Sequence, residues 1–307
     1  MIVRLILVCC GIIALSKVSL SKPILTKKTL DRTHQVLSQN ILTFSNSIDE
    51  YFSNTENTNI ENKSRLLVSF DTYFREAAGP YIIPNIDFRL VLPNTQDKLR
   101  LVLESDEQIG NSDTSREFTD PNSSDESLRK AGFKYIIEKS KIQFAATSGI
   151  IVNLPPDLFI RLTAKRNIKL GDWLLKIDEE LRWVNNTGIT SDTDINFDLQ
   201  LSEKYLLRFV NNIFWNDNSY SVRFENGPSL FHKISNNKAL AYHAHVVSIN
   251  SPNFILTNYI LRLSYRQNIY SDWTFIKITP FLNFPRENNF QRVPGMVVGI
   301  DALFGHI

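Results

Sequence analysis

The stretch FILTNYILRLSYRQNIYSDWTFIKITPFLNFPRENNFQRVPGMVVGIDALF, residues 254–304, decides the fold. It holds three extended segments in which apolar side chains alternate with polar or small ones, and short turn-rich pieces join them. In the middle segment, for example, Ile276 and Ile278 flank Lys277. Successive side chains of a β-strand point to opposite faces. Each segment therefore has one apolar face and one polar face.

The first 21 residues have the pattern of a secretory signal peptide. One early positive charge precedes a short apolar run, and Ser19 and Ser21 supply the small residues of a cleavage site. Cleavage would remove both cysteines, Cys9 and Cys10, so the mature chain would form no disulfide. A retained helical anchor is the alternative.

Charge gives no reason to expect a nucleic-acid partner. The whole chain has a formal net charge of +2, from 34 basic and 32 acidic side chains. Arg4 and Lys17 lie in the predicted signal peptide, so the mature chain would be neutral. Nucleic-acid binding depends on an excess of basic side chains.

Residues 22–64 are predicted to form one helix and a polar linker ahead of a β domain at 65–307. Apolar and aromatic residues recur at heptad spacing over 26–52, which favours a short helix that lies in the periplasm or plugs the barrel. The heptad residues are Leu30, His34, Leu37, Ile41, Phe44, Ile48 and Tyr51. A self-associating coiled coil is the sharper alternative, although three heptads are marginal alone.

The β domain is predicted to contain fourteen strands, with twelve or sixteen also possible. A long acidic, serine-rich loop at 106–130 interrupts them, and we expect it on the outer side of a membrane. The strands are predicted at 66–74, 83–92, 99–105, 133–138, 141–151, 158–166, 172–184, 193–202, 204–215, 220–231, 239–249, 254–266, 272–284 and 295–304.

Strand length and aromatic spacing favour a transmembrane barrel over a soluble sandwich. Several segments have ten or more residues, as a tilted membrane strand requires. Trp173 and Trp183 lie on one face of a strand, ten residues apart, and Tyr205 and Trp215 repeat this spacing. Ten residues of a tilted strand span about 25 Å along the membrane normal, which is the height of the apolar band between aromatic girdles. Because lipid offers no hydrogen bonds to a free strand edge, the sheet must close.

The face opposite the apolar one is charged on strand after strand, so we expect a charged lumen. Large side chains, Phe159, Trp273 and Phe275, are also predicted to point inward, and with paired charges they would narrow the lumen. The predicted lumen-facing charges are Asp87, Arg89, Arg100, Arg161, Lys176, Asp178, Glu180, Arg182, Arg262, Arg266, Lys277 and Asp301.

Two positions disagree with the alternation. Glu179 and Asn211 share the apolar face of their strands, although both lie in mid-strand. An acidic side chain that faces lipid is costly. Either a β-bulge shifts the register there, which is the interpretation we favour, or both residues face a partner chain.

The chain resembles Gram-negative outer-membrane β-barrel proteins, and is similar to uncharacterised barrels with an N-terminal periplasmic helix. The resemblance rests on the signal peptide, on residues 261–290 and on the closing GMVVGIDALF. The last segment resembles the β-signal of such barrels, with Met296, Val298, Ile300, Ala302 and Phe304 at every second position, although three residues follow Phe304. The resemblance implies the cell outer membrane, its lipid and its assembly machinery as location and partners.

The sequence favours a channel over an enzyme. His243 and His245 alternate on one strand and would point inward, but no third metal ligand and no complete catalytic set follows, so we expect no catalysis, metal or cofactor. The predicted function is a narrow or gated channel for small solutes. The alternative is a structural barrel that binds a partner through the helix or loop 106–130, as a homo-oligomer or with a periplasmic protein, and an outer-membrane hydrolase ranks third.

Overall fold

A computed structural model describes residues 64–75, 78–92, 98–105, 129–139, 142–170, 173–202, 204–218, 221–235, 237–271 and 273–305. The predicted signal peptide, the helix predicted over 26–52 and most of the loop predicted over 106–130 lie outside these residues. The predictions made for those segments, including the plug, therefore stay predictions.

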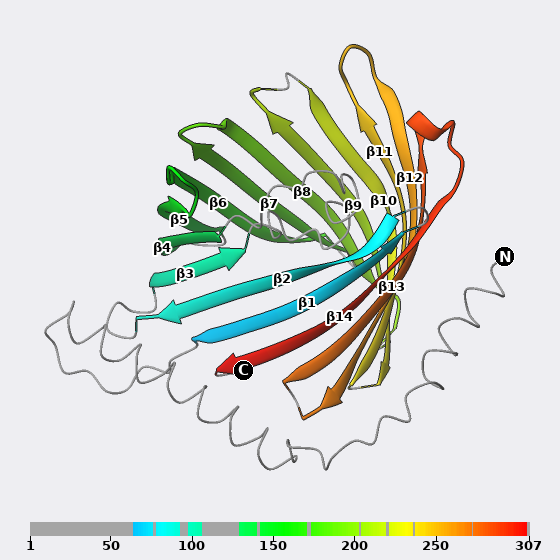
Figure 1. Cartoon of the computed structure of the whole chain (residues 1–307), viewed down its shortest axis with the longest axis horizontal. Coiled ribbons are helices and arrows are strands. Elements are labelled where there is room, and N and C mark those ends of the chain that lie inside the picture. The colour runs from blue at the N-terminus through cyan, green and yellow to red at the C-terminus, as the bar shows by residue number, and fades with distance from the viewer. Residues whose placement is uncertain are drawn as a thin grey trace, which may run out of the picture. The chain divides into compact units, whose positions relative to one another are not determined.

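Fourteen antiparallel strands form one closed barrel (Figure 1). Each strand pairs with its neighbours in the chain, and one 3-10 turn, η3 (Arg286–Asn288), precedes the last strand. The strands are β1 (Arg65–Arg75), β2 (Ala78–Val91), β3 (Leu99–Ser105), β4 (Arg129–Lys139), β5 (Ile142–Ile151), β6 (Asp157–Leu170), β7 (Trp173–Val184), β8 (Gly188–Gln200), β9 (Tyr205–Asn216), β10 (Val222–Ser235), β11 (Lys238–Ile249), β12 (Ile255–Tyr270), β13 (Thr274–Pro285) and β14 (Val293–Gly305).

The barrel closes between its first and last strands, which lie side by side in Figure 1. Leu66 pairs with Phe304 and Arg75 with Gly295, so the pairing covers all of β1. Closure leaves no strand edge without hydrogen-bond partners, which a bilayer requires. The predicted antiparallel barrel, its fourteen strands and the pairing of its first and last strands are confirmed.

Alternation along the strands separates an apolar outer face from a polar inner face. On β8, the inward side chains of Asp192, Asp194 and Asp198 are buried within the barrel. On the outer face, apolar side chains are exposed as they would be to lipid, with Ile82 at 64% and Phe70 at 53%. A soluble barrel would show the opposite pattern at its surface.

Strand β8 begins at Gly188 and not, as predicted, at Thr193. Apart from outward Ile189, its first half is polar on both faces, with Ser191 and Thr193 outward and Asp192 and Asp194 inward. Apolar alternation, the signal used for prediction, is therefore missing from this half. Strand β12 also extends past its predicted end, to Tyr270.

The favoured β-bulge at Glu179 is wrong. Strand β7 pairs without a register shift on both sides, and Glu179 lies between Ala164 of β6 and Thr193 of β8. The same holds near Asn211, because β9 keeps one register against β8 from Thr190 to Gln200. Both side chains therefore share the outward face with their apolar neighbours.

The connections fall at two ends of the barrel. The terminal end, where β1 starts and β14 finishes, has the connections 92–98, 140–141, 171–172, 201–204, 236–237 and 271–273. The loop end has 76–77, 106–128, 152–156, 185–187, 217–221, 250–254 and 286–292. The longest connection thus lies at the loop end, as predicted for the outer side of the membrane.

No helix among the described residues is long and apolar enough to cross a bilayer.

Candidate functional site: the charged lumen wall

The register directs the predicted charges inward. They alternate along their strands with exposed apolar neighbours such as Ile86, Leu103 and Leu181. Across strands, the register pairs Asp87 with Glu104, Arg161 with Arg182 and Arg266 with Lys277. Inward positions with the same sign therefore also meet, and opposite charges from a third strand must balance them.

The first charge cluster spans the strands that close the barrel. Lys277 of β13 contacts Asp71 of β1 and Asp301 of β14, each with an N–O distance of 3.1 Å. Arg266 contacts Asp301 at 3.3 Å and lies 4.2 Å above the ring of Phe275. The cluster therefore links β12, β13, β14 and β1 on their inner face.

Gly299 makes the contact between Lys277 and Asp71 possible. It lies on β14 between the two side chains, paired with Asp71 on one side and Lys277 on the other. A Cβ atom at this position would lie 1.9 Å from Asp71 Oδ1 and 2.9 Å from Lys277 Cε. Only glycine leaves room for the ion pair to cross above its own backbone.

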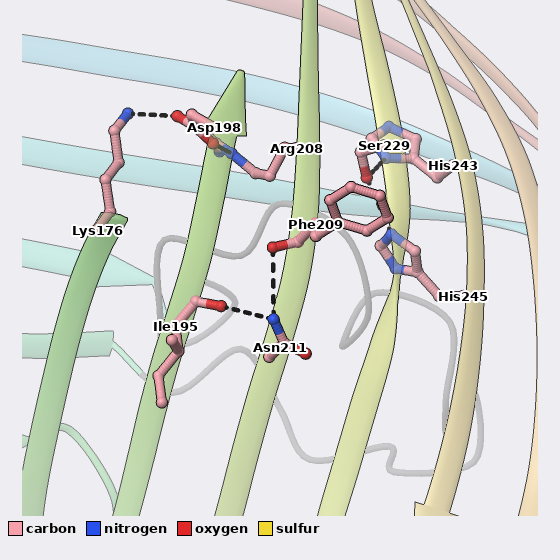
Figure 2. Close-up of polar contacts among 9 residues, drawn as sticks. All are labelled: Lys176, Ile195, Asp198, Arg208, Phe209, Asn211, Ser229, His243 and His245. Atoms are coloured by element: carbon pink, nitrogen blue, oxygen red, sulfur yellow. Dashed lines mark hydrogen bonds and ion pairs between the residues drawn. The ribbon is translucent and has the colours of Figure 1, made fainter. Parts of the chain in front are cut away.

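A second cluster joins β7, β8 and β9 (Figure 2). Asp198 accepts two hydrogen bonds from Arg208, at 2.6 and 2.7 Å, and contacts Lys176 Nζ at 3.0 Å. Nearby, Lys165 contacts Asp178 at 3.4 Å. Asp198 is 3% exposed, so its charge depends on these two cations.

The cations of both clusters lie in the halves of their strands that are nearer the terminal end. Lys176, Arg208 and Lys277 are each the fourth residue of their strand, counted from the terminal end. Lys165 and Arg266 lie near the ends of β6 and β12, which run toward the same end. We call these five residues the basic belt.

In these pairs the cation is the more exposed partner. The exposed fractions of the side chains are 52% for Arg266 against 7% for Asp301, and 34% for Lys176 against 3% for Asp198. Lys165, Lys277 and Arg208 show the same order. A carboxylate on a short side chain lies against the wall, whereas a longer basic side chain reaches into the solvent. The belt therefore presents positive charge to the water.

One pair has the opposite order. Arg161 forms two hydrogen bonds with Glu104, at 2.9 and 3.0 Å, and its side chain is 8% exposed against 22% for Glu104. Asp87 and Glu180 add negative charge near the same guanidinium. A bidentate arginine–carboxylate contact fixes the geometry of the pair as well as balancing its charges. Here it joins β6 to β3.

The wall from β8 to β11 is buried and polar. Asn212 donates to Asp192 at 2.7 Å and to Asp194 at 2.9 Å, and its own side chain is 0% exposed. The neighbouring residue on β10, Glu225, is also 0% exposed. Buried polar groups of this kind need partners, and hydrogen bonds across the strands supply them.

The predicted histidines belong to this buried wall. Ser229 Oγ lies 2.8 Å from Nδ1 of His243 and 2.9 Å from Nε2 of His245 (Figure 2). Nδ1 of His245 lies 2.8 Å from Glu225 Oε1, and Arg223 contacts the other oxygen at 3.0 Å. With Nδ1 of His245 donating to Glu225, Nε2 accepts from Ser229, and His243 donates to the same hydroxyl.

Sequence reasoning missed Ser229, Glu225, Asp71, Asp198 and Arg208. Their inward direction follows from alternation, but their contacts depend on register between strands, which no local pattern shows. It found both histidines and did not find their partners. Among the described residues, no group of three or more metal-binding side chains gathers.

Two apolar clusters lie on the inner face, toward the loop end. One contains Tyr73, Phe281 and Val297, and the other Ile151, Phe159 and Val184. Phe281 lies over Gly295, where a Cβ would come within 2.2 Å of the ring. Inward Phe159 is 2% exposed, and Phe275 lies under Arg266. Trp273 instead lies in the turn before β13, where its ring packs on Tyr270 and Phe304.

The outer face carries the aromatic side chains expected at the membrane boundaries. Trp173 and Tyr205 begin β7 and β9, while Trp183 and Trp215 lie one residue from their ends. On β4 to β7, mostly apolar side chains and Glu179 border a groove of about 310 Å³, whose lining includes Phe144, Ala146, Leu162, Ala164 and Leu181. On β14, Met296, Val298, Ile300, Ala302 and Phe304 share the outward face, with Ile300 49% exposed.

No protein-family model matches the chain, and no curated protein matches it. A solved structure does: a loop L8 deletion mutant of OmpT, an outer membrane protein of Vibrio cholerae, with a TM-score of 0.50 and 11% identity over 80% of this chain and 99% of that one. The chain has the fold of an outer-membrane β-barrel protein. A refined porin (TM-score 0.44, 8% identity, 80% and 100% coverage) and the KdgM porin in complex with disordered oligogalacturonate (0.39, 5%, 77% and 98%) are also similar.

The likeness to these structures concerns the fold alone. The fold and the exposed apolar side chains of its outer face agree with the predicted location, the cell outer membrane. Lipid is then the first partner of the outward side chains, as predicted. The assembly machinery and a periplasmic protein remain predicted partners.

Proposed function

We propose that this barrel is a narrow channel for small solutes and that it prefers anions. The support is the order of exposure in the basic belt, where the cations face the water and their carboxylates lie against the wall. Rings of basic side chains favour anions in pores. In a confined lumen, fixed charges act on passing ions more strongly than on an open surface.

Paired charges and buried wall residues support a narrow path. Asp192, Asp194 and Glu225 are almost inaccessible to solvent, although they belong to the lumen wall. The exposed fractions of Lys165, Lys176 and Arg266 mark the part of the wall that water reaches. Solutes would therefore pass through the lumen close to these exposed residues of the basic belt.

The test is the reversal potential of the purified full chain in planar bilayers under a KCl gradient. We expect an anion-selective value, and a smaller one for Lys176→Gln combined with Arg266→Gln. Arg286→Gln, an exposed change in the turn η3, is the control and should leave the value unchanged. A cation-selective potential would contradict the preference for anions, and no conductance with and without residues 22–64 would contradict the channel.

The order of hydrogen bonds in Ser229–His245–Glu225 favours a second candidate, a hydrolase. A hydroxyl, an imidazole and a carboxylate in this order activate a serine nucleophile. Ser229 is 0% exposed, which leaves a substrate no contact with its oxygen. A fluorophosphonate probe separates the two functions: we expect no labelling, whereas labelling that Ser229→Ala abolishes would favour the hydrolase.

A further inference from the structure

Five polar side chains face outward on four neighbouring strands, where lipid would otherwise meet apolar residues. They are Glu179 of β7, Ser191 and Thr193 of β8, Asn211 of β9 and Asn226 of β10. We call them the outer polar patch. Because the strands keep their register here, no local distortion turns these side chains inward.

Hydrogen bonds hold the patch together. Ser191 donates to one carboxylate oxygen of Glu179 at 2.9 Å, and Thr193 donates to the other at 2.5 Å. Asn211 donates to the backbone oxygens of Ile195 at 3.0 Å and of Phe209 at 3.5 Å (Figure 2), and Asn226 donates to the side-chain oxygen of Asn211 at 3.0 Å. The patch therefore consists of two hydrogen-bonded groups, Glu179 with Ser191 and Thr193 and Asn211 with Asn226, and the bond from Asn211 to the Ile195 backbone ties the second group to β8.

The patch keeps hydrogen-bonding capacity that lipid tails cannot use. No lysine or arginine of the described residues lies within ion-pair distance of Glu179, and its two hydroxyl partners fill half of the positions at which a carboxylate accepts hydrogen bonds. Asn226 has a second amide hydrogen and an oxygen beyond the bond it makes to Asn211. Exposing each such unsatisfied group to hydrocarbon costs on the order of several kcal/mol.

Glu179 and Asn211 lie at the same depth. Each is the seventh residue of its strand, and both strands run from an outward aromatic at the terminal end, Trp173 or Tyr205. Strand β8 lies between these two strands. Two positions at one depth on either side of a central strand are the arrangement that a twofold axis exchanges.

We propose that the outer polar patch is the contact between two copies of this chain. A twofold axis along the membrane normal, in front of β8, keeps every residue at its depth and sets β7 of one copy against β9 of the other. Glu179 then approaches the partner subunit's Asn211 and, beside it, the partner subunit's Asn226, whose second amide hydrogen can donate to the carboxylate; this contact occurs twice in each dimer. A second copy offers this match because the same patch carries both the carboxylate acceptor and the amide donor.

The test is a disulfide between two differently tagged copies in native membranes, one with Glu179→Cys and the other with Asn211→Cys. Both copies carry Cys9→Ser and Cys10→Ser, so that no other thiol is present. We expect the 179–211 pair to form faster than 179–179. Phe70→Cys with Leu103→Cys is the matched control, because these outward residues flank β2 as the test pair flanks β8.

A second measurement tests the proposal even if the cysteine variants assemble poorly in the membrane. Sedimentation in mild detergent should give a dimer for the wild type and a folded monomer for Glu179→Leu combined with Asn211→Leu. Any of four results would overturn the proposal. They are the absence of a 179–211 disulfide, a 179–211 disulfide that forms no faster than that of the control pair, a monomeric wild type, and association with a different protein in place of a second copy. Channel activity that persists in the monomeric variant would leave the proposed function intact.

Discussion

Lys277 and Asp71 form an ion pair between residues 206 positions apart in the chain, with their contact directly above Gly299. The pair spans β14 on the lumen side, so it ties β13 to β1 at the point where the barrel closes. Backbone pairing closes the sheet, and this contact adds a side-chain link across the last strand.

Gly299→Ala should weaken this link. The new Cβ would overlap Asp71 Oδ1, so the two charges must separate within a partly buried site. We expect a loss of about 2 kcal/mol in the free energy of unfolding, less than for a fully buried pair because Lys277 is partly exposed. Urea unfolding in lipid vesicles, followed by tryptophan fluorescence, measures it. Gly79→Ala, which meets nothing within 4 Å, is the control, and an equal loss there would contradict the explanation.

Phe281 and Gly295 should show strong coupling. The Phe281 ring covers Gly295, so Gly295→Ala alone displaces the ring from its cluster with Tyr73 and Val297. Phe281→Ala alone should cost about 3–5 kcal/mol as a large-to-small change in packed surroundings. In the double variant, Gly295→Ala should cost little, because the ring it collides with is gone. A double-mutant cycle by the same unfolding measurement gives the coupling, and additive losses would rule it out.

Alternation predicted the faces of the strands far better than their contacts. It placed Lys277 and Asp301 in the lumen, because face depends only on odd and even positions. The pairing of the last strand with the first followed instead from the need to close a sheet in lipid. It lost the start of β8, where both faces are polar, and it suggested a bulge at Glu179 that does not exist. The partners of His243 and His245 lie on another strand, so they depend on register, which sequence parity alone does not set.

Ser229→Ala should destabilise the barrel more than the removal of one oxygen atom suggests. The hydroxyl bonds both imidazoles, and its loss leaves two buried ring nitrogens without their partner. We expect a cost of about 2–3 kcal/mol, the penalty for unsatisfied buried polar groups. Ser148→Ala is the matched control, since Ser148 is exposed on the outer face of β5 and should change stability little. Equal effects would show that the buried network contributes nothing.

Asp198→Asn should separate charge from hydrogen bonding in the basic belt. The amide keeps one acceptor for Arg208 but removes the negative charge that Arg208 and Lys176 share. Because both cations remain and one is well exposed, the belt gains net positive charge at the water. We expect a more anion-selective reversal potential, together with a stability loss of about 1–3 kcal/mol. Glu287→Gln, an exposed acid in η3, controls for a general change in net charge. If both variants shift the reversal potential equally, the selectivity does not arise from the belt.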